Sequence, residues 1–144
     1  MMLKPDAVQR GLIGQLMTRF EQRGLCFTAI KMIRLSPEMA GRHYAEHEGK
    51  PFYPGLIAFI TSGPVVATVI QGPDAVAAVR QTLGLTKPLA SPTGSIRGDF
   101  ALSTGRNLVH ASANMNDAER EIALFFSPSE IVTYERELDR WIVE

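Results

Sequence analysis

A run of β-branched residues in the middle of the chain limits most strongly the folds open to it. Val65-Val66-Ala67-Thr68-Val69-Ile70 follows the chain-breaking pair Gly63-Pro64 and predicts a buried strand. A second, longer strand is predicted over residues 25–35, where the side chains alternate along the run. Strands of this kind bury apolar faces only against other strands or helices, so the chain has to fold around a sheet.

Helical patterns separate these strands. Apolar side chains recur at helical spacing over residues 12–20, and Gly24 follows where a glycine often ends a helix. Ser36-Pro37-Glu38 predicts a helix start, with serine as N-cap, proline in the first turn and a favourable carboxylate. That helix is expected to end near Gly49. Further helices are expected over residues 52–62, 74–83 and 117–126.

The order of elements favours an α+β fold. A short strand, Met1-Met2-Leu3, precedes a predicted turn at Lys4-Pro5-Asp6, and a last strand leads to His110. This order fits a ferredoxin-like βαββαβ sandwich, with a four-stranded, mainly antiparallel sheet and helices on one face. A doubly wound parallel sheet is the competing fold, but it would need more strands. We expect a single domain over residues 1–144, with a truncated first strand.

Net charge and cysteine content exclude several classes of protein. Fifteen basic and fifteen acidic residues cancel, so no overall field favours nucleic acid or anionic membranes, and any anion site must be local. The single cysteine, Cys26, excludes an internal disulfide and favours a reduced intracellular setting. No stretch approaches the roughly 20 apolar residues of a membrane span, and no secretory signal is evident. We therefore expect a cytoplasmic domain with neither a membrane nor a specific nucleic-acid partner.

One histidine follows a short apolar run late in the chain. In Asn107-Leu108-Val109-His110-Ala111-Ser112-Ala113-Asn114, the imidazole stands where a strand would meet a loop. A neutral imidazole is a nucleophile near neutral pH, because its unperturbed pKa is about 6.5. By itself the pattern is more typical of a polar residue that closes a strand, so only more distant residues can favour the nucleophile.

Basic residues gather in and around the irregular part of the chain. Neither a P-loop nor a Gly-x-Gly-x-x-Gly cradle is present. Residues 85–97 form a loop longer than compact domains usually keep without a function. Guanidinium and ammonium groups bind phosphate oxygens. Such groups stand at turns and in this loop, at Lys4, Arg80, Lys87, Arg97 and Arg106.

A metal site is a weaker hypothesis. His43 and His47 are spaced i, i+4 on the helix predicted to start at Pro37, which is the spacing of a metal-binding pair. His-Glu-x-x-His is absent, and no third ligand is evident. A solvated helical face is therefore favoured for these two histidines.

Several short motifs occur in a fixed order along the chain. They are Lys4-Pro5-Asp6, Gln9-Arg10-Gly11-Leu12, Pro51-Phe52, Gly55-Leu56, Ser62-Gly63-Pro64-Val65, Ile96-Arg97-Gly98-Asp99-Phe100, Gly105-Arg106-Asn107, Asn107-x-x-His110-Ala111-Ser112 and the closing Trp141-Ile142-Val143-Glu144. Together they resemble the nucleoside diphosphate kinase family over essentially the whole chain. The resemblance implies a ferredoxin-like fold. It also implies ping-pong transfer of the γ-phosphate of a nucleoside triphosphate, typically ATP, to a nucleoside diphosphate through phosphohistidine.

The resemblance implies a role for each matched residue. His110 would be the nucleophile through Nδ1, with Glu121 accepting a hydrogen bond from the other ring nitrogen and Ser112 supporting that carboxylate. Tyr44 would line the pocket beside the imidazole. The other matched residues imply nucleotide binding: Lys4 and Arg97 at the γ-phosphate, Arg80 and Thr86 at the outer phosphates, Asn107 and Lys4 at the ribose, and Phe52 stacked on the base.

The same resemblance implies Mg²⁺ carried by the nucleotide phosphates. It also implies a homo-oligomer, with a hexamer favoured over a tetramer and the loop over residues 85–97 as the place of subunit packing. Ala111, Ala113 and Thr104 depart from the more usual glycine, aspartate and apolar residue, which would change local rigidity and base packing. The altered loop after His110 motivates an alternative hypothesis, a non-catalytic nucleotide-binding or scaffold member of the same fold.

Overall fold

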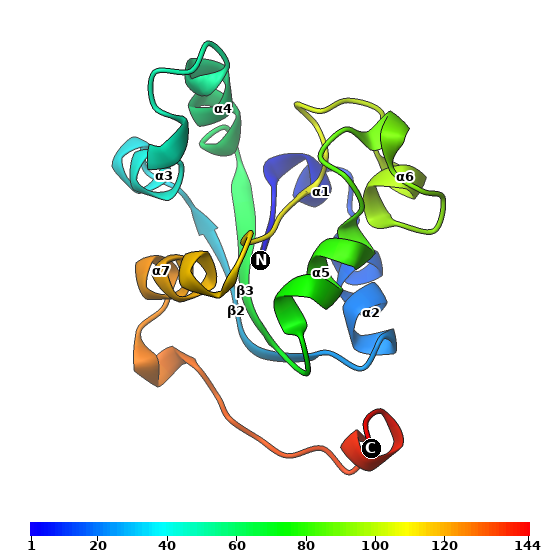
Figure 1. Ribbon diagram of the computed structural model, residues 1–144. Coiled ribbons are helices and arrows are strands. Elements are labelled where there is room, and N and C mark those ends of the chain that lie inside the picture. Colours follow the sequence, from blue (N-terminus) through cyan, green and yellow to red (C-terminus); the bar gives the residue numbers. More distant parts are fainter.

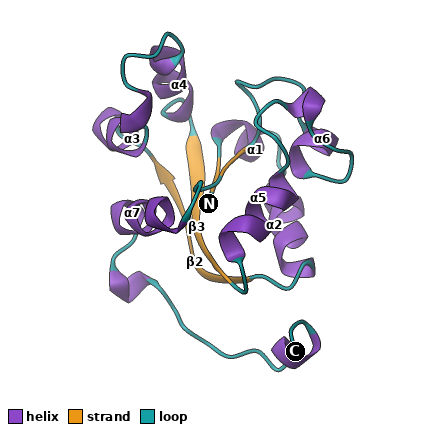
Figure 2. Ribbon diagram, in the orientation of Figure 1, coloured by secondary structure: helices purple, strands orange, loops and turns teal.

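The computed structural model describes all residues 1–144, and one antiparallel sheet lies at its centre (Figure 2). Its strands are ordered β2-β3-β1-β4. Their bounds are Met2–Leu3 for β1, Cys26–Arg34 for β2, Pro64–Gln71 for β3 and Val109–His110 for β4. The predicted α+β fold with a four-stranded antiparallel sheet is confirmed.

The strand predicted to be buried is β3, which pairs with β2 along one side and with β1 along the other. Val65, Val66 and Ala67 are almost completely buried, and neighbours along a strand point to opposite faces. Val66 belongs to one apolar cluster, whereas Val65 and Ala67 belong to a second. Helices therefore cover both faces of the sheet. The prediction of helices on one face is wrong, because β3 is apolar at both odd and even positions.

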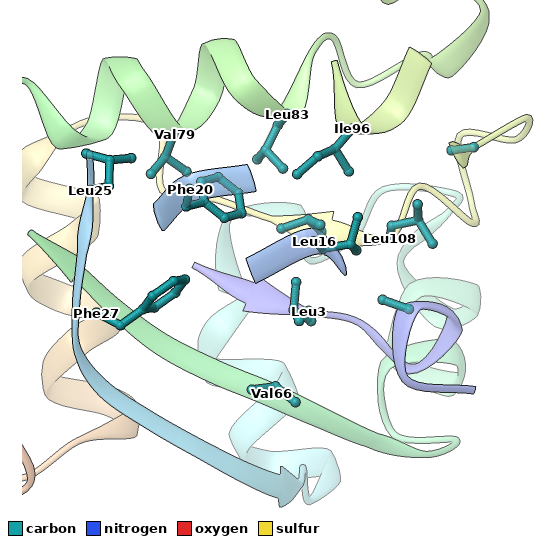
Figure 3. Packing of buried hydrophobic residues seen from close by; sticks show 13 residues of the cluster. Leu3, Leu16, Phe20, Leu25, Phe27, Val66, Val79, Leu83, Ile96 and Leu108 are labelled. Atoms are coloured by element: carbon teal, nitrogen blue, oxygen red, sulfur yellow. The ribbon is translucent and has the colours of Figure 1, made fainter. Parts of the chain in front are cut away.

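Four helices cover the face toward which Val66 points. Phe20 and Phe27 meet edge to face there, with ring centroids 6.4 Å apart. Figure 3 shows Phe20 with Val79 and Leu83 in this cluster. The helices are α1 (Pro5–Gln9), α2 (Ile13–Gln22), α5 (Ala75–Leu83) and α6 (Ile96–Phe100).

Two of these helices stand where irregular chain was predicted, at the turn Lys4-Pro5-Asp6 and at the end of the loop over residues 85–97. Pro5 opens α1, and proline is compatible with the first helical turn because its missing N–H would have no partner there. Ser95 caps α6, since its Oγ accepts a hydrogen bond from the Gly98 N–H at 3.2 Å. Helices of five residues are too short to show a helical period in the sequence.

Three helices cover the opposite face: α3 (Pro37–His43), α4 (Tyr53–Ile60) and α7 (Met115–Phe125). The predicted cap of α3 is confirmed, because the Ser36 Oγ accepts a hydrogen bond from the Met39 N–H at 3.2 Å. Asn114 caps α7 in the same way through the Asp117 N–H at 2.9 Å. Figure 1 shows α3 and α7 on one side of the strands and α2 and α5 on the other.

The helix that carries His43 is shorter than predicted. It ends at His43, and Ala45–His47 forms a separate 3₁₀ turn. His43 is 2% exposed in the core, whereas His47 stays at the surface beside Glu46. The predicted i, i+4 pair therefore does not exist on one helix, and His47 is absent from the group of possible metal ligands around His43.

A β-bulge changes the direction of the side chains along β2. The register shifts between Phe27 and Ala29, so Phe27 joins the first cluster and Ala29 the second. Beyond the bulge Ile30 and Met32 are 53% and 56% exposed. Simple alternation over residues 25–35 could not predict this reversal, because one extra residue moves every later side chain to the other face.

The remaining segments are irregular. Gly84 ends α5 with a φ of +81°, a conformation that glycine adopts without strain. The loop after it contains a 3₁₀ turn at Pro88–Ala90. The C-terminal tail has two further 3₁₀ turns, Pro128–Glu130 and Asp139–Trp141, and passes below the sheet in Figure 1. None of the helices has both the length and the apolar character needed to cross a membrane.

Candidate functional site

His110 is held at the end of β4 by an unusual backbone. Two residues earlier, Leu108 adopts a φ of +71°, which is uncommon for a residue other than glycine. Its N–H donates to the Asp6 Oδ2 at 3.0 Å, and its carbonyl accepts from the Lys4 N–H at 2.8 Å. Next to this bend, Met2 of β1 pairs with His110 of β4. Backbone strain of this kind persists where surrounding contacts over-determine it, and here those contacts come from the N-terminal segment.

The imidazole is oriented through one nitrogen. His110 Nε2 lies 2.9 and 3.0 Å from the two carboxylate oxygens of Glu121, and the Ser112 hydroxyl donates to Glu121 Oε2 at 2.8 Å. An ionised carboxylate only accepts hydrogen bonds, so the neutral ring carries its proton on Nε2. Nδ1 then keeps a lone pair and is not part of this contact.

Burial and hydrogen bonding set the charges of this pair. Burial lowers the pKa of His110, and it does so more strongly than the Glu121 carboxylate raises it. Burial alone would raise the pKa of Glu121, but the hydrogen bonds from His110 and Ser112 lower it to about 2. At neutral pH the site therefore holds a neutral imidazole against a charged carboxylate.

Aromatic side chains pack around this imidazole. Tyr44 meets His110 edge-on with centroids 5.8 Å apart, and His43 does so at 4.4 Å. Burial raises the pKa of the Tyr44 hydroxyl and lowers the pKa of His43 to about 3. Both groups are therefore neutral, and no charged group touches the ring from this side.

A second group of predicted residues meets at the start of β4. The Lys4 ammonium donates to Asn107 Oδ1, and Asn107 Nδ2 donates to the Thr86 carbonyl at 2.9 Å. Arg97 donates to three backbone carbonyls, those of Gly84, Asn107 and Val109. The structure therefore brings Lys4, Thr86, Arg97 and Asn107 together from four separate parts of the chain.

The cations of this group have no carboxylate partners. Lys4, Arg80 and Arg97 take part in none of the salt bridges of the protein. Burial, together with the smaller effect of the charge of Arg80, lowers the pKa of Arg97 to about 10. Burial likewise lowers the pKa of Lys4 to about 8. Lys4 is buried and Arg97 half-buried, whereas Arg80 is exposed. Buried or half-buried cations without counter-ions favour an anionic ligand, since such a ligand would supply the missing partner.

Phe52 lies at the open side of the site. It immediately precedes α4, is 54% exposed, and contacts the His47 ring at a centroid distance of 5.5 Å. His47 in turn stacks on Tyr44 at 6.0 Å. Phe52 is therefore connected to the imidazole through the rings of His47 and Tyr44 and does not contact it directly.

A cleft of about 730 Å³ reaches the imidazole from the side of α5 and α7. Arg80, His110, Ser112 and Glu121 line it, together with His43. Of the other predicted residues, Lys4, Tyr44, Phe52, Thr86, Arg97 and Asn107 lie outside this cleft. The phosphate and nucleoside contacts expected of those residues therefore belong to the neighbouring surface around the start of β4.

Three contributors were not among the predicted site residues. Asp6 and Leu108 shape the backbone that presents His110, and His43 packs on its ring. Asp6 belongs to the motif Lys4-Pro5-Asp6, so its part in the site could have been predicted from the family resemblance. A left-handed leucine has no local signal, because the N-terminal segment imposes the conformation. His43 was assigned to a solvated helix face, and the early end of α3 places it in the core instead.

Fold and site together define a class of protein. A neutral imidazole with one oriented and one available nitrogen, beside unpaired cations, is the arrangement of a phosphotransferase that works through a histidine nucleophile. The family model for nucleoside diphosphate kinase matches residues 1–131. The chain belongs to the nucleoside diphosphate kinase family, whose enzymes transfer phosphate from nucleoside triphosphates to nucleoside diphosphates.

Individual relatives agree with this assignment. The chain is 54% identical over 141 residues to a nucleoside diphosphate kinase of Thermomicrobium roseum, covering 98% of this chain and 95% of that one. It is 55% identical over 131 residues to one from Thermus thermophilus, covering 91% and 96%. Among solved structures, a halophilic nucleoside diphosphate kinase from Halobacterium salinarum in complex with CDP superposes with a TM-score of 0.96 at 49% identity, covering 99% and 95%.

Proposed function

We propose that His110 carries the phosphate between the two nucleotides through its Nδ1 atom. The hydrogen bond from Nε2 to Glu121, at 2.9 Å, is the observation that supports this assignment, because it leaves the Nδ1 lone pair free. In the first step Nδ1 forms a bond to the γ-phosphorus, the bond to the β-phosphate oxygen breaks, and the nucleoside diphosphate leaves. In the second step the terminal oxygen of another nucleoside diphosphate attacks that phosphorus, and the N–P bond breaks.

Glu121 and Ser112 keep the imidazole ready for this attack. When Nδ1 bonds to phosphorus the ring gains positive charge, and a carboxylate at 2.9 Å stabilises it without taking its proton. The Ser112 hydroxyl holds that carboxylate in place. Tyr44 packs against one side of the ring and limits its rotation.

Lys4 and Arg97 are proposed to bind the γ-phosphate, and Arg80 with Thr86 the outer phosphates. Phosphoryl transfer proceeds through a loose transition state, and cations around the equatorial oxygens stabilise it. The carbonyl contacts of Arg97 hold its guanidinium in position before any ligand binds. Asn107 and Lys4 would reach the ribose hydroxyls. Phe52 would stack on the base, and an exposed ring face accepts any base.

Mg²⁺ is proposed to accompany the nucleotide phosphates. The ion prefers oxygen ligands in octahedral geometry, whereas the one group of possible ligands offers two imidazole nitrogens and a carboxylate already bonded to His110 and Ser112. These residues do not suit Mg²⁺, so we assign it no direct protein ligand and derive no step through it.

A homo-oligomer is proposed on the basis of exposed apolar surface, and a hexamer rather than a tetramer on the basis of the family resemblance. Strand β2 forms an edge of the sheet, and Ile30 and Met32 are more than half exposed on it. Leu85 and Leu89, in the loop expected to pack between subunits, are 57% and 84% exposed. Sedimentation of the native protein tests this, and a monomer at micromolar concentration would contradict it.

The phosphoenzyme itself gives the direct test of the proposed mechanism. Incubation with γ-labelled ATP and Mg²⁺ should label the protein, and the label should be stable to alkali and lost in acid. His110→Ala should not label, whereas His47→Ala, a change at the surface histidine, should label like the parent. Equal labelling of His110→Ala would remove the assignment.

A second nucleotide separates the enzyme from the non-catalytic alternative. GDP added to the labelled protein should take up the label as GTP, whereas a carrier or scaffold would keep it. The alternative hypothesis is not favoured, because the relatives over the whole chain are nucleoside diphosphate kinases and because the contacts of Glu121 to His110 and Ser112 are complete despite the alanines at positions 111 and 113.

A further inference from the structure

His43 is a buried polar side chain without a partner. It is 2% exposed, and no protein group lies within hydrogen-bonding distance of either Nδ1 or Nε2. Apart from Asp6 Oδ1, these are the only buried side-chain polar atoms of the protein in this condition. Buried polar groups are nearly always hydrogen-bonded, so an unpaired imidazole next to a reactive one requires an explanation.

The surroundings of His43 provide metal ligands. One ligand atom each from His43, His110 and Glu121 lies within 4.8 Å of the other two. Two imidazoles and a carboxylate form a ligand set typical of Zn²⁺, with a fourth position open to water. Tetrahedral ligands at Zn²⁺ bond lengths lie about 3.3 Å apart. The His110 Nε2 and Glu121 Oε2 atoms, at 2.9 Å, are already near this spacing, so the remaining adjustment falls to the His43 ring.

The site also has an entry path and a supporting contact. All three residues line the cleft of about 730 Å³ between α5 and α7. Ser112 holds one Glu121 oxygen, as groups around metal ligands commonly do. The guanidinium of Arg120, 3.9 Å from the other oxygen, is the one arginine or lysine group in salt-bridge range of Glu121. It opposes a cation there, but its side chain is 45% exposed and can move into solvent.

We propose that a divalent transition metal of the Zn²⁺ type binds His43, His110 and Glu121 and holds the enzyme inactive. The metal takes the place of the proton on His110 Nε2, which is released to solvent, and forms bonds to this nitrogen, one Glu121 oxygen and one His43 nitrogen. Electron density drawn toward the metal weakens Nδ1 as a nucleophile, and the carboxylate no longer stabilises the charged ring. Inhibition rests on the role proposed for His110, whereas metal binding does not.

His43→Phe tests the proposal, since phenylalanine keeps the aromatic contacts and removes both nitrogens. His47→Phe, at the half-buried histidine nearby, is the matched control. Transfer from ATP to GDP is measured over a range of buffered free Zn²⁺ with Mg²⁺ in constant excess, and each variant is compared with its own zinc-free rate. Removing a group that only supports a metal ligand typically weakens metal binding about 10–100-fold. Removing a ligand itself should cost at least as much, so His43→Phe should raise the inhibitory Zn²⁺ concentration by at least about tenfold. The control should match the parent.

Equal sensitivity of His43→Phe and the parent would overturn the proposal. In that case zinc would be inhibiting through Cys26 or through the nucleotide, because both variants retain Cys26 and use the same substrates. If His43→Phe does not fold, imidazole NMR of the parent decides instead. Zinc should shift the ring nitrogens of His43 and His110 and leave those of His47, and shifts confined to His47 would refute the site. The zinc-free phosphoenzyme assay tests the role of His110 separately.

Discussion

Lys4 should make phosphate transfer depend on pH in alkaline solution. The side chain is 7% exposed, and burial lowers its pKa from 10.5 to about 8, with Asp6 opposing and Arg97 and Arg106 adding to the shift. Below about pH 8 the ammonium is charged and can bind the γ-phosphate; above that pH the free enzyme loses this cation. A charge-assisted hydrogen bond is worth about 1.5–3 kcal/mol, so kcat/KM should fall roughly 10–100-fold as the pH rises through this value.

Stability should change in the opposite direction. Between about pH 8 and 10.5 the unfolded chain holds the Lys4 proton and the folded chain does not, so the contribution of Lys4 to stability rises with pH in this window. The lowered pKa means that burying the charged Lys4 side chain destabilises the folded state by roughly 3 kcal/mol. Lys4→Met removes this penalty and should raise the melting temperature at pH 7, while kcat/KM drops to a low value.

The assay is kcat/KM for ATP, with GDP as the acceptor, over a pH range of roughly 6.5 to 9.5 that brackets the lowered pKa of Lys4. This ratio reports the free enzyme, whereas kcat reports the complex, in which bound phosphate favours the charged lysine. The parent should lose activity with an apparent pKa near 8, and Lys4→Met should not show this step. A step of the same size and position in Lys4→Met would refute the reasoning, because another group would then carry it.

Three further substitutions test the positioning of the imidazole, the base and the backbone. Ser112→Ala removes the hydroxyl that holds Glu121, and kcat should fall about tenfold with KM little changed; an unchanged kcat would contradict this. Phe52→Ala removes a stacking face worth about 1–3 kcal/mol, so KM should rise while kcat remains; equal KM values would place the base elsewhere. Asp6→Ala leaves the Leu108 N–H unpaired and should cost about 1–3 kcal/mol in unfolding experiments, and full stability would show that water replaces the carboxylate.

Long patterned segments of the fold could be predicted, and short ones could not. The β-branched run at 65–70 became β3, and residues 25–35 became β2, because many side chains in each favour the same element. The helix α1 was predicted as a turn and the start of α6 as part of a loop, since five residues show no helical period. The bulge in β2 depends on pairing with a distant segment, which local patterns do not contain. The burial of both sheet faces, in contrast, had a local signal in the apolar odd and even positions of β3.

Some features of the candidate site could likewise be predicted from the sequence, and others could not. His110, Glu121 and Ser112 meet as the family resemblance implied, and Lys4 meets Asn107. The left-handed Leu108 could not be predicted, because Asp6 and Lys4 hold it from about a hundred residues away. His43 was placed on a solvated face because the helix was expected to continue past it.

A protein with no net charge can bind a polyanion only where its charges are separated. Here Lys4, Arg80 and Arg97 have no carboxylate partner, whereas Glu121 is directed at the imidazole. Lys4 opposes protonation of His110, because its charge lowers the pKa of the imidazole. The carboxylate would stabilise the positive charge that the ring gains when phosphorus bonds to it. The same neighbourhood therefore favours a neutral nucleophile before transfer and a charged phosphohistidine after it, because bound phosphate would neutralise the cations while the carboxylate stays in place.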